Sequence, residues 1–570
     1  MENVQKDLLP GKRITILPTN NCSRQIFRVL PVIVFLSMFL SCSKDSGDDN
    51  FKLPETPDTS DKEQIDPNKI VNINTESVVG EMYNFWSTRP MVNQTRFTSS
   101  NFTGGLESIK TYVKSYNLVR VLGGRTDGLN NFYKGVDTNG NIITDFSGLI
   151  SSMQGFMQTG FKPRIVLDNV PWEMNAVREE NKYGNTNPPD DYIVWRQYIN
   201  AFLNVLIDEF TYDEVKTWRF RVATEPNYVP EHWNGTKEEF FKHYDITVDE
   251  VLKVIPDAII GPGNLLTEGA AEWRTEIIDH CANGTNYATG EIGTRMSFFC
   301  LSYYEKIDQN TINFPETVEP YRTKLNSYAQ FADIPFDIQE FGILRDEYGN
   351  RGLSLSDATE LGASWYATIA DMAYKYKITE IYDWGQESTD ALATGRRNVT
   401  SMFLKMVNGN RLAATHNMSG HVGTIPAIKD GKIYLLIYNH NTTRTSTAKK
   451  SIYPKIEGTQ IGSTTHWEMN EWTVDKDHGI FMHELYKDVK VAGVSNKTGS
   501  SARIYGNRPD DYFNTGWEDI FNANKSKYTE LAKLPQTIND SIVGKAEDGS
   551  LTLKVDLGPH SVKLIELIPQ

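Results

Sequence analysis

The sequence is poor in cysteine, in net positive charge and in metal-ligand spacings, and each shortage excludes a class of protein. Four cysteines in 570 residues are too few for a disulfide scaffold. Cys281 and Cys300 leave two alternatives open, a disulfide in an oxidising compartment or two buried thiols. No Cys-x-x-Cys or His-x-x-x-His spacing occurs, so we expect no metal and no cofactor. The formal net charge of −15 argues against a nucleic-acid partner, because binding phosphate requires a basic surface.

Apolar and aromatic residues, in contrast, are plentiful. The chain is 39% hydrophobic and 11% aromatic, with 11 Trp and 27 Tyr, which indicates a globular protein with room for two or three domains. Aromatic side chains suit sugar-stacking surfaces, but large cores use them as well.

The hydrophobic run Val29–Ser41 is too short, and ends too abruptly, for a typical membrane span. It ends at Cys42 and follows four basic residues, Lys12, Arg13, Arg24 and Arg28. This arrangement resembles a bacterial lipoprotein signal, which implies cleavage before Cys42 and lipid attachment to its thiol. The acidic stretch after Cys42 resembles the export signal of Bacteroidota surface lipoproteins, so we expect a signal peptide over 1–42, a tether over 43–69 and an outer-membrane, surface-exposed protein. An uncleaved anchor helix is the alternative.

Residues 70–410 alternate short apolar runs with amphipathic segments. Eight candidate strands lie at residues 79–87, 118–124, 162–170, 217–225, 258–264, 297–304, 335–342 and 378–385, and helical stretches include Asp191–Glu209, Lys237–Val254 and Leu355–Tyr374. Eight strands alternating with helices are typical of a (β/α)8 TIM barrel, the α/β fold we expect here. A doubly wound sheet is the alternative, but no Gly-x-Gly-x-x-Gly turn opens a helix.

Residues 411–570 change to period-two alternation around Gly and Asn turns, with one helical interlude near Trp517–Leu534. This pattern predicts a C-terminal β-sandwich domain.

Two glutamates stand where expected strands of the barrel end. Glu225 closes the fourth strand and Glu340 lies in the seventh, each followed by a distinctive pair of residues, Pro226-Asn227 and Phe341-Gly342. Side chains at the carboxyl ends of barrel strands line the active site. Paired carboxylates can hydrolyse a glycosidic bond, one donating a proton to the leaving oxygen and the other attacking the anomeric carbon or activating water. A separation of about 5–5.5 Å would imply the retaining route.

The segments around both glutamates resemble glycoside hydrolase family 39, the β-xylosidase and α-L-iduronidase group of clan A. "TEPNYVPEHW" is similar to the family's Asn-Glu-Pro-Asn followed by Phe-Trp, and "IPFDIQEFG" to its nucleophile segment; "VDKDHG", "NRPDDY" and "LGPHSVKLIELI" resemble its C-terminal sandwich. The similarity runs from about residue 70 to the end of the chain. It implies that Glu225 is the general acid/base and Glu340 the nucleophile, with retention of configuration.

The departures from the family pattern bear on the substrate. Thr224 stands where clan members have the Asn that binds the sugar 2-hydroxyl, and Ala223 replaces a Trp. Arg120 is kept in the second strand, but Leu122 replaces the histidine two positions later. In the sixth strand Leu301 and Ser302 replace two basic residues, while Tyr304 is kept and is expected to hold Glu340 by a phenolic hydrogen bond.

Further residues are expected at the rim of the barrel. Trp384 is a candidate stacking platform, with Gln386 and Glu387 beside it. Asn227 is a candidate sugar ligand, and Arg125, Arg345 and Arg351 could pair with sulfate or carboxylate, or could be solvated loop charges. For Trp86 and Trp172 we weigh core and cleft equally, and His232 and Trp233 are candidates for a leaving-group site.

We therefore expect a lipid-anchored retaining glycosidase acting on a poly- or oligosaccharide. The loss of hydroxyl-binding side chains favours an anhydro, sulfated, deoxy or uronic sugar, as in a red-algal galactan, over plain xylose. There are two alternatives, a catalytically silent carbohydrate-binding lipoprotein and a structural adhesion protein. Neither explains why two glutamates are present at matching strands of the barrel.

Overall fold

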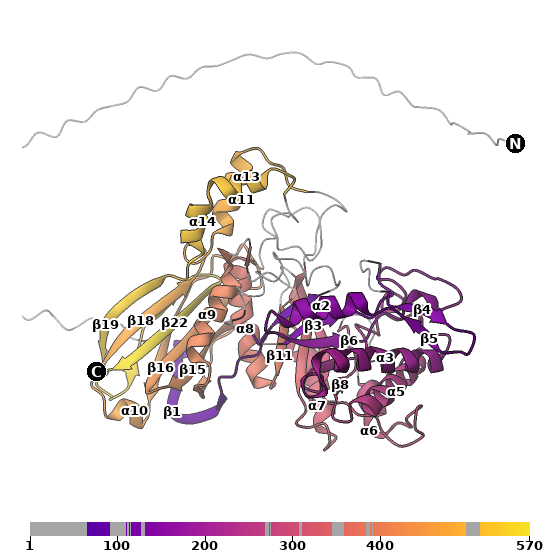
Figure 1. The fold of residues 1–570 in the computed structure, drawn as a ribbon. Coiled ribbons are helices and arrows are strands. Elements are labelled where there is room, and N and C mark those ends of the chain that lie inside the picture. Colours follow the sequence, from indigo (N-terminus) through magenta and orange to yellow (C-terminus); the bar gives the residue numbers. More distant parts are fainter. Residues whose placement is uncertain are drawn as a thin grey trace, which may run out of the picture. The chain divides into compact units, whose positions relative to one another are not determined.

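The computed structural model describes residues 65–91, 110, 113–114, 116–126, 131–267, 273, 275–306, 311–344, 358–383, 388–389, 392–497 and 513–570 (Figure 1). Cys42 and nearly all of the expected tether lie outside these residues. Among the helices of the described part, none is long and apolar enough to span a membrane.

Seven of the eight expected strands of residues 70–410 overlap strands of one parallel eight-stranded sheet. The first, 79–87, is wrong in its bounds, because only Trp86 and Ser87 lie in this sheet and residues 79–81 belong to a strand of another sheet. The parallel sheet contains β2 (Trp86–Met91), β3 (Tyr116–Arg120), β6 (Lys162–Val166), β7 (Arg219–Arg221), β8 (Ile259–Gly261), β9 (Phe299–Lys306), β10 (Phe336–Leu344) and β11 (Glu380–Asp383). Their order is β8-β7-β6-β3-β2-β11-β10-β9. The two ends of this order meet at a parallel bridge between Leu265, just after β8, and Leu301 of β9. Each strand thus neighbours the next along the chain, as in a (β/α)8 barrel.

Helices lie between these strands or, for the last of them, follow the sheet along the chain, as the alternating pattern predicts. They are α2 (Ser147–Met157), α3 (Tyr192–Phe210), α4 (Tyr212–Val215), α5 (Lys237–Val254), α6 (Glu276–Asn283), α7 (Phe314–Asn326), α8 (Glu360–Lys375) and α9 (Gly395–Met406). Helix α5 has the predicted bounds because Thr236 and Glu239 form a capping box at its start. The smaller elements here are η3 (Trp172–Met174) and the strand pairs β4 (Tyr133–Val136) with β5 (Ile142–Thr144) and β12 (Ser388–Thr389) with β13 (Leu392–Ala393).

A buried ionic network joins strands that are not neighbours in the sheet. Arg164 of β6 donates to Asp337 of β10 at 2.5 Å and to Glu380 of β11 at 3.5 Å. All three side chains are fully buried. Since three strands separate β6 from β10 along the sheet, the contact must cross its interior, so opposite strands face each other.

A second sheet of ten strands contains most of the C-terminal region. Its strands are β1 (Ile70–Glu81), β14 (Asn410–Thr415), β15 (His421–Lys429), β16 (Lys432–His440), β17 (Lys450–Glu457), β18 (His466–Val474), β19 (Gln536–Gly544), β20 (Leu551–Thr552), β21 (Val555–Leu557) and β22 (Ser561–Pro569). Hydrogen bonds join all of them into one large curled sheet, so the expected two-sheet sandwich is visible only in part. The Asp430-Gly431 turn between β15 and β16 has positive φ at both residues, the geometry of a tight hairpin.

The N-terminal strand corrects the expected domain boundary. Ile70–Glu81, which follows the short η1 helix (Pro67–Lys69), was assigned to the barrel domain, but β1 pairs antiparallel with β14 and parallel with β17. Val71 and Ile73 are buried in the apolar core of the second sheet. The alternation in the sequence is that of a strand, but it does not say which sheet the strand joins.

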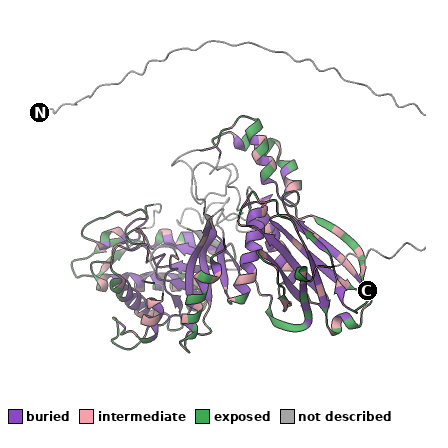
Figure 2. Ribbon diagram, turned by 180° about the vertical axis from the view of Figure 1, so that it is seen from behind, coloured by how far each residue is buried: buried purple, intermediate pink, exposed green. Residues whose placement is uncertain are grey.

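Strand β16 is buried on both faces. Leu435 and Ile437 belong to the core of the second sheet, whereas Leu436 and Tyr438 belong to the large core shared with the barrel helices. The Tyr438 hydroxyl donates to Asp371 of α8 at 2.8 Å. The second sheet therefore packs on α8 and α9, and burial is continuous through both sheets (Figure 2).

Three helices lie beside one another above the second sheet (Figure 1). Helices α13 (Trp517–Ala523) and α14 (Lys525–Ala532) occupy the predicted interlude, but α11 (Met482–Val491) was not expected, nor was the short α10 (Thr459–Gly462). The sequence carries a signal for α11, since Met482, Leu485 and Val489 are buried at helical spacing.

Both cysteines of this part of the chain are free and buried. Of the two alternatives, Cys281 and Cys300 are therefore thiols, and the Cys300 thiol donates to the carbonyl of Pro262 at 3.5 Å.

Candidate active site

Glu225 lies four residues after β7, the fourth strand of the parallel sheet, in an unusual backbone conformation. Its φ is +41°, a left-handed value that is uncommon for a residue with a side chain. Its N–H donates to the carbonyl of Asn264 at 3.0 Å, and its own carbonyl accepts from the N–H of Tyr228 at 2.8 Å. These bonds hold the turn, and strained backbone of this kind is frequent at functional sites.

The Glu225 carboxyl is 6% exposed and has a different neighbour on each oxygen. The Ser302 hydroxyl donates to Oε1 at 2.5 Å, while Oε2 lies 3.6 Å from Nε2 of His232. Burial, and after it the charge of Glu340, raise the pKa of Glu225 to about 8. The Ser302 hydrogen bond, Arg120 and Arg221 oppose this shift without cancelling it. Glu225 is therefore protonated at neutral pH.

Glu340 lies on β10 beside a break in the strand register. Ile338 pairs with Leu301 and Glu340 with Ser302, so Gln339 is an extra residue, a β-bulge of the kind that re-aims side chains near active sites. The Tyr304 hydroxyl donates to Glu340 Oε2 at 3.0 Å, and Arg120 Nη2 lies 3.6 Å from Oε1. The predicted contact between Tyr304 and Glu340 is confirmed, and both contacts are those that an anionic carboxylate makes.

A buried layer of polar residues joins the two glutamates. The Thr224 hydroxyl accepts from Arg120 Nη2 at 2.6 Å and from Arg221 Nη2 at 2.7 Å. Arg221 also donates to Gln339 at 2.9 Å. Burial, and next the charge of Arg120, lower the pKa of Arg221 to about 10, which still leaves it protonated at neutral pH. Thr224 thus holds two guanidinium groups, and the layer places two positive charges near the two carboxyls.

The loops after β6 and β7 place two aromatic rings beside Glu225. The rings of Tyr183 and His232 stack with centroids 4.3 Å apart and planes 11° apart. Arg125, 9% exposed, lies with its guanidinium 6.0 Å from the Tyr183 ring centroid and donates to Asn169 at 3.5 Å. A Cβ at Gly184 would come within 2.1 Å of the Gly124 carbonyl, so the close contact between the loops after β3 and β6 requires glycine.

The remaining predicted residues have different surroundings. Both groups of the Asn227 amide bond to the backbone of Leu266 at 2.8 Å, so this side chain ties two loops together, and its role as a sugar ligand stays a prediction. Trp86 is fully buried and stacks on Phe85, which assigns it to the core rather than to a cleft. Trp233 is also a core residue, at 4% exposure. Trp172 is half-buried under Arg178, whose guanidinium lies 4.0 Å from its ring centroid.

Several expected rim residues, namely Trp384, Gln386, Glu387, Arg345 and Arg351, lie outside the described residues. Conversely, Asn264, Arg221 and Gln339 belong to the site without having been predicted. Asn264 lies three residues after β8, at the end of the strand expected over 258–264, and donates to Ser302 at 2.7 Å. Its position at a strand end is the signal that could have identified it. Gln339 faces Arg221 because of the bulge in β10, and the sequence pattern gives no signal from which this bulge could be predicted.

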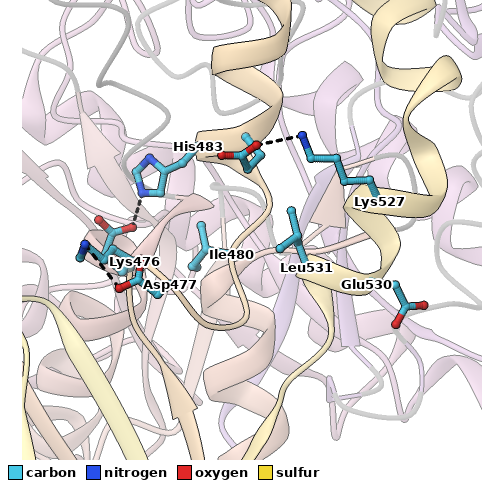
Figure 3. A pocket seen from close by; sticks show the side chains of 9 residues that line it. Lys476, Asp477, Ile480, His483, Lys527, Glu530 and Leu531 are labelled. Atoms are coloured by element: carbon cyan, nitrogen blue, oxygen red, sulfur yellow. Dashed lines mark hydrogen bonds and ion pairs between the residues drawn. The ribbon is translucent and has the colours of Figure 1, made fainter. Parts of the chain in front are cut away.

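A cavity of about 730 Å³ lies among α8, α11, α14 and the turn before α11 (Figure 3). Its lining is mostly charged and is made by Glu360, Lys476, Asp477, Ile480, His483, Glu484, Lys527, Glu530 and Leu531. None of these residues belongs to the glutamate pair or its contacts, and many of the charges pair with one another, including Lys527 with Glu484 at 2.8 Å.

The pair His483–Glu360, 2.6 Å apart, joins α11 to α8 in this cavity. Burial by itself would lower the pKa of His483, but the hydrogen bond and charge of Glu360 outweigh it, and the pKa is raised. A raised histidine pKa stabilises the fold fully below about pH 6.5, the unfolded value, and the contribution is lost as pH rises through the folded value. We expect the urea midpoint of His483→Gln to fall below that of the wild type at pH 6 and to match it at pH 9. A difference that is constant with pH would contradict this.

The described residues contain no cluster of His, Cys, Asp and Glu that could hold a metal ion. What the site offers chemically is one carboxyl group that burial keeps protonated and a second that contacts a tyrosine hydroxyl and an arginine, close enough for the charge of the second to raise the pKa of the first. Two such groups in contrasting surroundings are suited to act as an acid and a nucleophile or base.

Comparison with known proteins assigns the chain to a family. The sequence profile of Glycosyl hydrolases family 39 matches residues 69–390, more than half of the chain. The alpha-1,4-L-rhamnosidase of Formosa agariphila is 24% identical over 368 residues, which cover 60% of this chain and 72% of that protein.

Solved structures agree on the fold. A GH39 enzyme from Xanthomonas axonopodis pv. citri, 13% identical, has a TM-score of 0.63, and the match covers 89% of this chain and 98% of that one. A monomeric beta-xylosidase from Caulobacter crescentus CB15, 15% identical, has a TM-score of 0.62 with 88% and 99% covered. The chain therefore belongs to glycosyl hydrolase family 39 and is an O-glycosyl hydrolase.

Proposed function

We propose that the chain is a retaining glycoside hydrolase whose (β/α)8 barrel presents Glu225 as general acid/base and Glu340 as nucleophile. The observation that carries this proposal is the contrast between the two carboxyls. Glu225 is buried with its pKa raised to about 8, whereas Glu340 receives a hydrogen bond from Tyr304 and lies 3.6 Å from Arg120.

In the first step Glu340 attacks the anomeric carbon while Glu225 gives its proton to the leaving oxygen. The bond to the aglycone breaks, and a glycosyl ester forms on Glu340. In the second step the Glu225 carboxylate removes a proton from water, which attacks the same carbon and releases Glu340. The sugar should therefore appear first as the anomer of the substrate, and NMR of the first product tests this. Initial formation of the opposite anomer would exclude the double displacement.

For the glycone we propose a deoxy sugar, first of all the 6-deoxy hexose L-rhamnose, whose methyl group at C6 needs no hydroxyl-binding side chain. Three side chains that could have bound hydroxyls are engaged inside the protein: Ser302 with Glu225, Thr224 with two arginines, and Asn227 with Leu266. The similarity to an alpha-1,4-L-rhamnosidase over 60% of the chain supports the same choice.

A substrate panel tests both parts of the proposal. The compact unit Gln64–Gln570, beside its Glu225→Gln and Glu340→Gln variants, would be assayed on aryl α-L-rhamnosides, β-D-xylosides and α-L-iduronides, and on xylans, glycosaminoglycans and sulfated red-algal galactans. Cleavage of a rhamnoside that both variants lose supports the mechanism and the sugar. Equal activity on xylosides would contradict the sugar. Binding without cleavage, equal in all three proteins, would favour a silent carbohydrate-binding protein.

The raised pKa of Glu225 predicts the alkaline limb of the pH profile. The acid must be protonated to assist the leaving group, so kcat/KM should fall about tenfold per unit above pH 8. Because the Ser302 hydrogen bond lowers the pKa of Glu225, Ser302→Ala should move this limb to higher pH. A limb that stays in place in Ser302→Ala, or moves down, would contradict the assignment of the acid.

We further propose that Cys42 carries the lipid that anchors the enzyme to the outer membrane. The basic flank, the apolar run and the cysteine in the sequence support this. Radiolabelled palmitate should be incorporated into the full chain in a Bacteroidota host, and Cys42→Ser should abolish the label. Label that persists in the variant would exclude this site.

A further inference from the structure

The hydrogen bonds around Glu225 indicate which of its oxygens bears the acid proton. Asn264 donates to the Ser302 hydroxyl oxygen at 2.7 Å, so the hydrogen of that hydroxyl points away from Asn264 and toward Glu225 Oε1 at 2.5 Å. Because Oε1 accepts this hydrogen, the proton of the neutral carboxyl belongs on Oε2. That oxygen faces Nε2 of His232 at 3.6 Å.

His232 is held in this place by its ring and by its loop. The imidazole is 8% exposed and stacks face to face on Tyr183. The backbone N–H of His232 donates to the carbonyl of Tyr228 at 2.9 Å. On either side of His232 the loop is tied to Thr186, which donates from its hydroxyl to the Pro230 carbonyl at 2.7 Å and accepts at its own carbonyl from the Asn234 N–H at 2.8 Å. The ring therefore has little freedom to turn away from Glu225.

The charges that face His232 disfavour its protonation. Burial, and then the positive charges of Arg120, Arg125, Arg221 and Lys182, lower the pKa of His232 well below its usual value. The nearest carboxyl, Glu225, is itself protonated at neutral pH. A neutral imidazole keeps one ring nitrogen free to accept a hydrogen bond.

We propose that His232 is a positioning residue for the general acid, accepting the hydrogen bond of Glu225 Oε2–H at Nε2 and so fixing the proton on the oxygen that serves the leaving group. This inference rests on the proposed function of Glu225. The distance of 3.6 Å is that of the free enzyme, where catalytic hydrogen bonds are often long and tighten when substrate binds. Once Glu225 is ionised, the imidazole can take its other neutral tautomer and donate to the same oxygen.

Histidine NMR of the full chain, with ¹³C and ¹⁵N in the imidazole, tests the contact without substrate. The His232 signal, identified by its loss in His232→Phe, should remain that of a neutral ring with unprotonated Nε2 from pH 5 to 7.5. It should then shift in one step near pH 8 as Glu225 ionises, and the step should be missing in Glu225→Gln. Titration of His232 near pH 6.5, or no step near pH 8, would overturn the proposal.

Leaving-group dependence tests the role in catalysis. His232→Phe keeps a ring to stack on Tyr183 but removes the acceptor nitrogen. It should lower kcat/KM about tenfold or more on 4-methoxyphenyl α-L-rhamnoside, whose departure needs an acid, and less than about threefold on the 2,4-dinitrophenyl rhamnoside, whose departure does not. The matched control His478→Phe makes the same exchange at a half-exposed histidine that pairs with Asp475, and should change neither rate by more than about twofold. Equal losses of kcat/KM on both substrates in His232→Phe would mean that His232 shapes the active site and does not position the proton of Glu225.

Glu225→Gln separates failure of this inference from failure of the proposed function. If Glu225→Gln keeps full activity on the 4-methoxyphenyl substrate, Glu225 is not the acid, and both proposals fail. If Glu225→Gln loses that activity but His232→Phe does not, only the role of His232 fails. Should the wild type turn over neither rhamnoside, the NMR titration by itself decides the contact.

Discussion

Replacing Glu340 with glutamine is expected to lower kcat/KM by about four orders of magnitude or more, because an amide cannot form the glycosyl ester. The fold should survive the change. Glutamine has nearly the same shape, its amide oxygen can still accept from Tyr304, and Arg120 keeps its hydrogen bond to Thr224. The loss should therefore be seen in turnover and not in the thermal midpoint.

The measurement is the initial rate on the best substrate of the panel, with the thermal midpoint followed in parallel. Glu179→Gln is a matched control, since Glu179 is an exposed carboxylate in the loop after β6 that accepts from Asn234 at 3.3 Å. It should keep activity within about twofold. Retention of more than one-hundredth of wild-type activity by Glu340→Gln, with no added nucleophile, would mean that Glu340 does not form the covalent intermediate.

Removing Asp337 is expected to cause the largest loss of stability. Arg164 is fully buried and bonds to Asp337 at 2.5 Å. In Asp337→Ala the positive charge of Arg164 stays buried, and its contact with Glu380 compensates it only in part. Breaking such a pair from one side typically costs about 3–5 kcal/mol. We expect a large drop in the urea midpoint measured by circular dichroism, with little soluble protein at 37 °C.

Two further variants show whether the lone charge is the cause. Asp337→Asn keeps an acceptor for Arg164 and should be less destabilised than Asp337→Ala. Arg164→Met combined with Asp337→Leu removes both charges and should recover much of the loss, since apolar replacement of a buried pair is often neutral or better. If the double variant is less stable than Asp337→Ala, the cost lies in packing rather than in the unpaired guanidinium.

The interior of the parallel sheet shows why single residues could be predicted but networks could not. The apolar residues of 162–170 and 335–342 predict two strands, observed at 162–166 and 336–344, in which Arg164 and Asp337 are ordinary strand positions. Their pairing depends on which strands face each other across the interior. Strands β6 and β10 face each other only once the sheet has closed on itself. The two partners are 173 residues apart in the chain, so no local pattern links them.

The sequence by itself determined the alternation of strands and helices and the association of the two glutamates with the fourth and seventh strands. These features rest on local periodicity and on chemistry that a strand end imposes. The family resemblance supplied the roles of the glutamates and the departures that bear on the sugar.

Only the tertiary structure decided the rest. It moved Ile70–Glu81 into the second sheet, shifted the register at Gln339 so that Glu340 pairs with Ser302, and brought His232 and Ser302 to opposite oxygens of Glu225. Each of these outcomes depends on which distant segments of the chain contact each other, and the sequence pattern does not specify those contacts. A strand pattern specifies which faces are apolar, whereas pairing, register and the surroundings of a buried carboxyl are set by the packing of the whole chain.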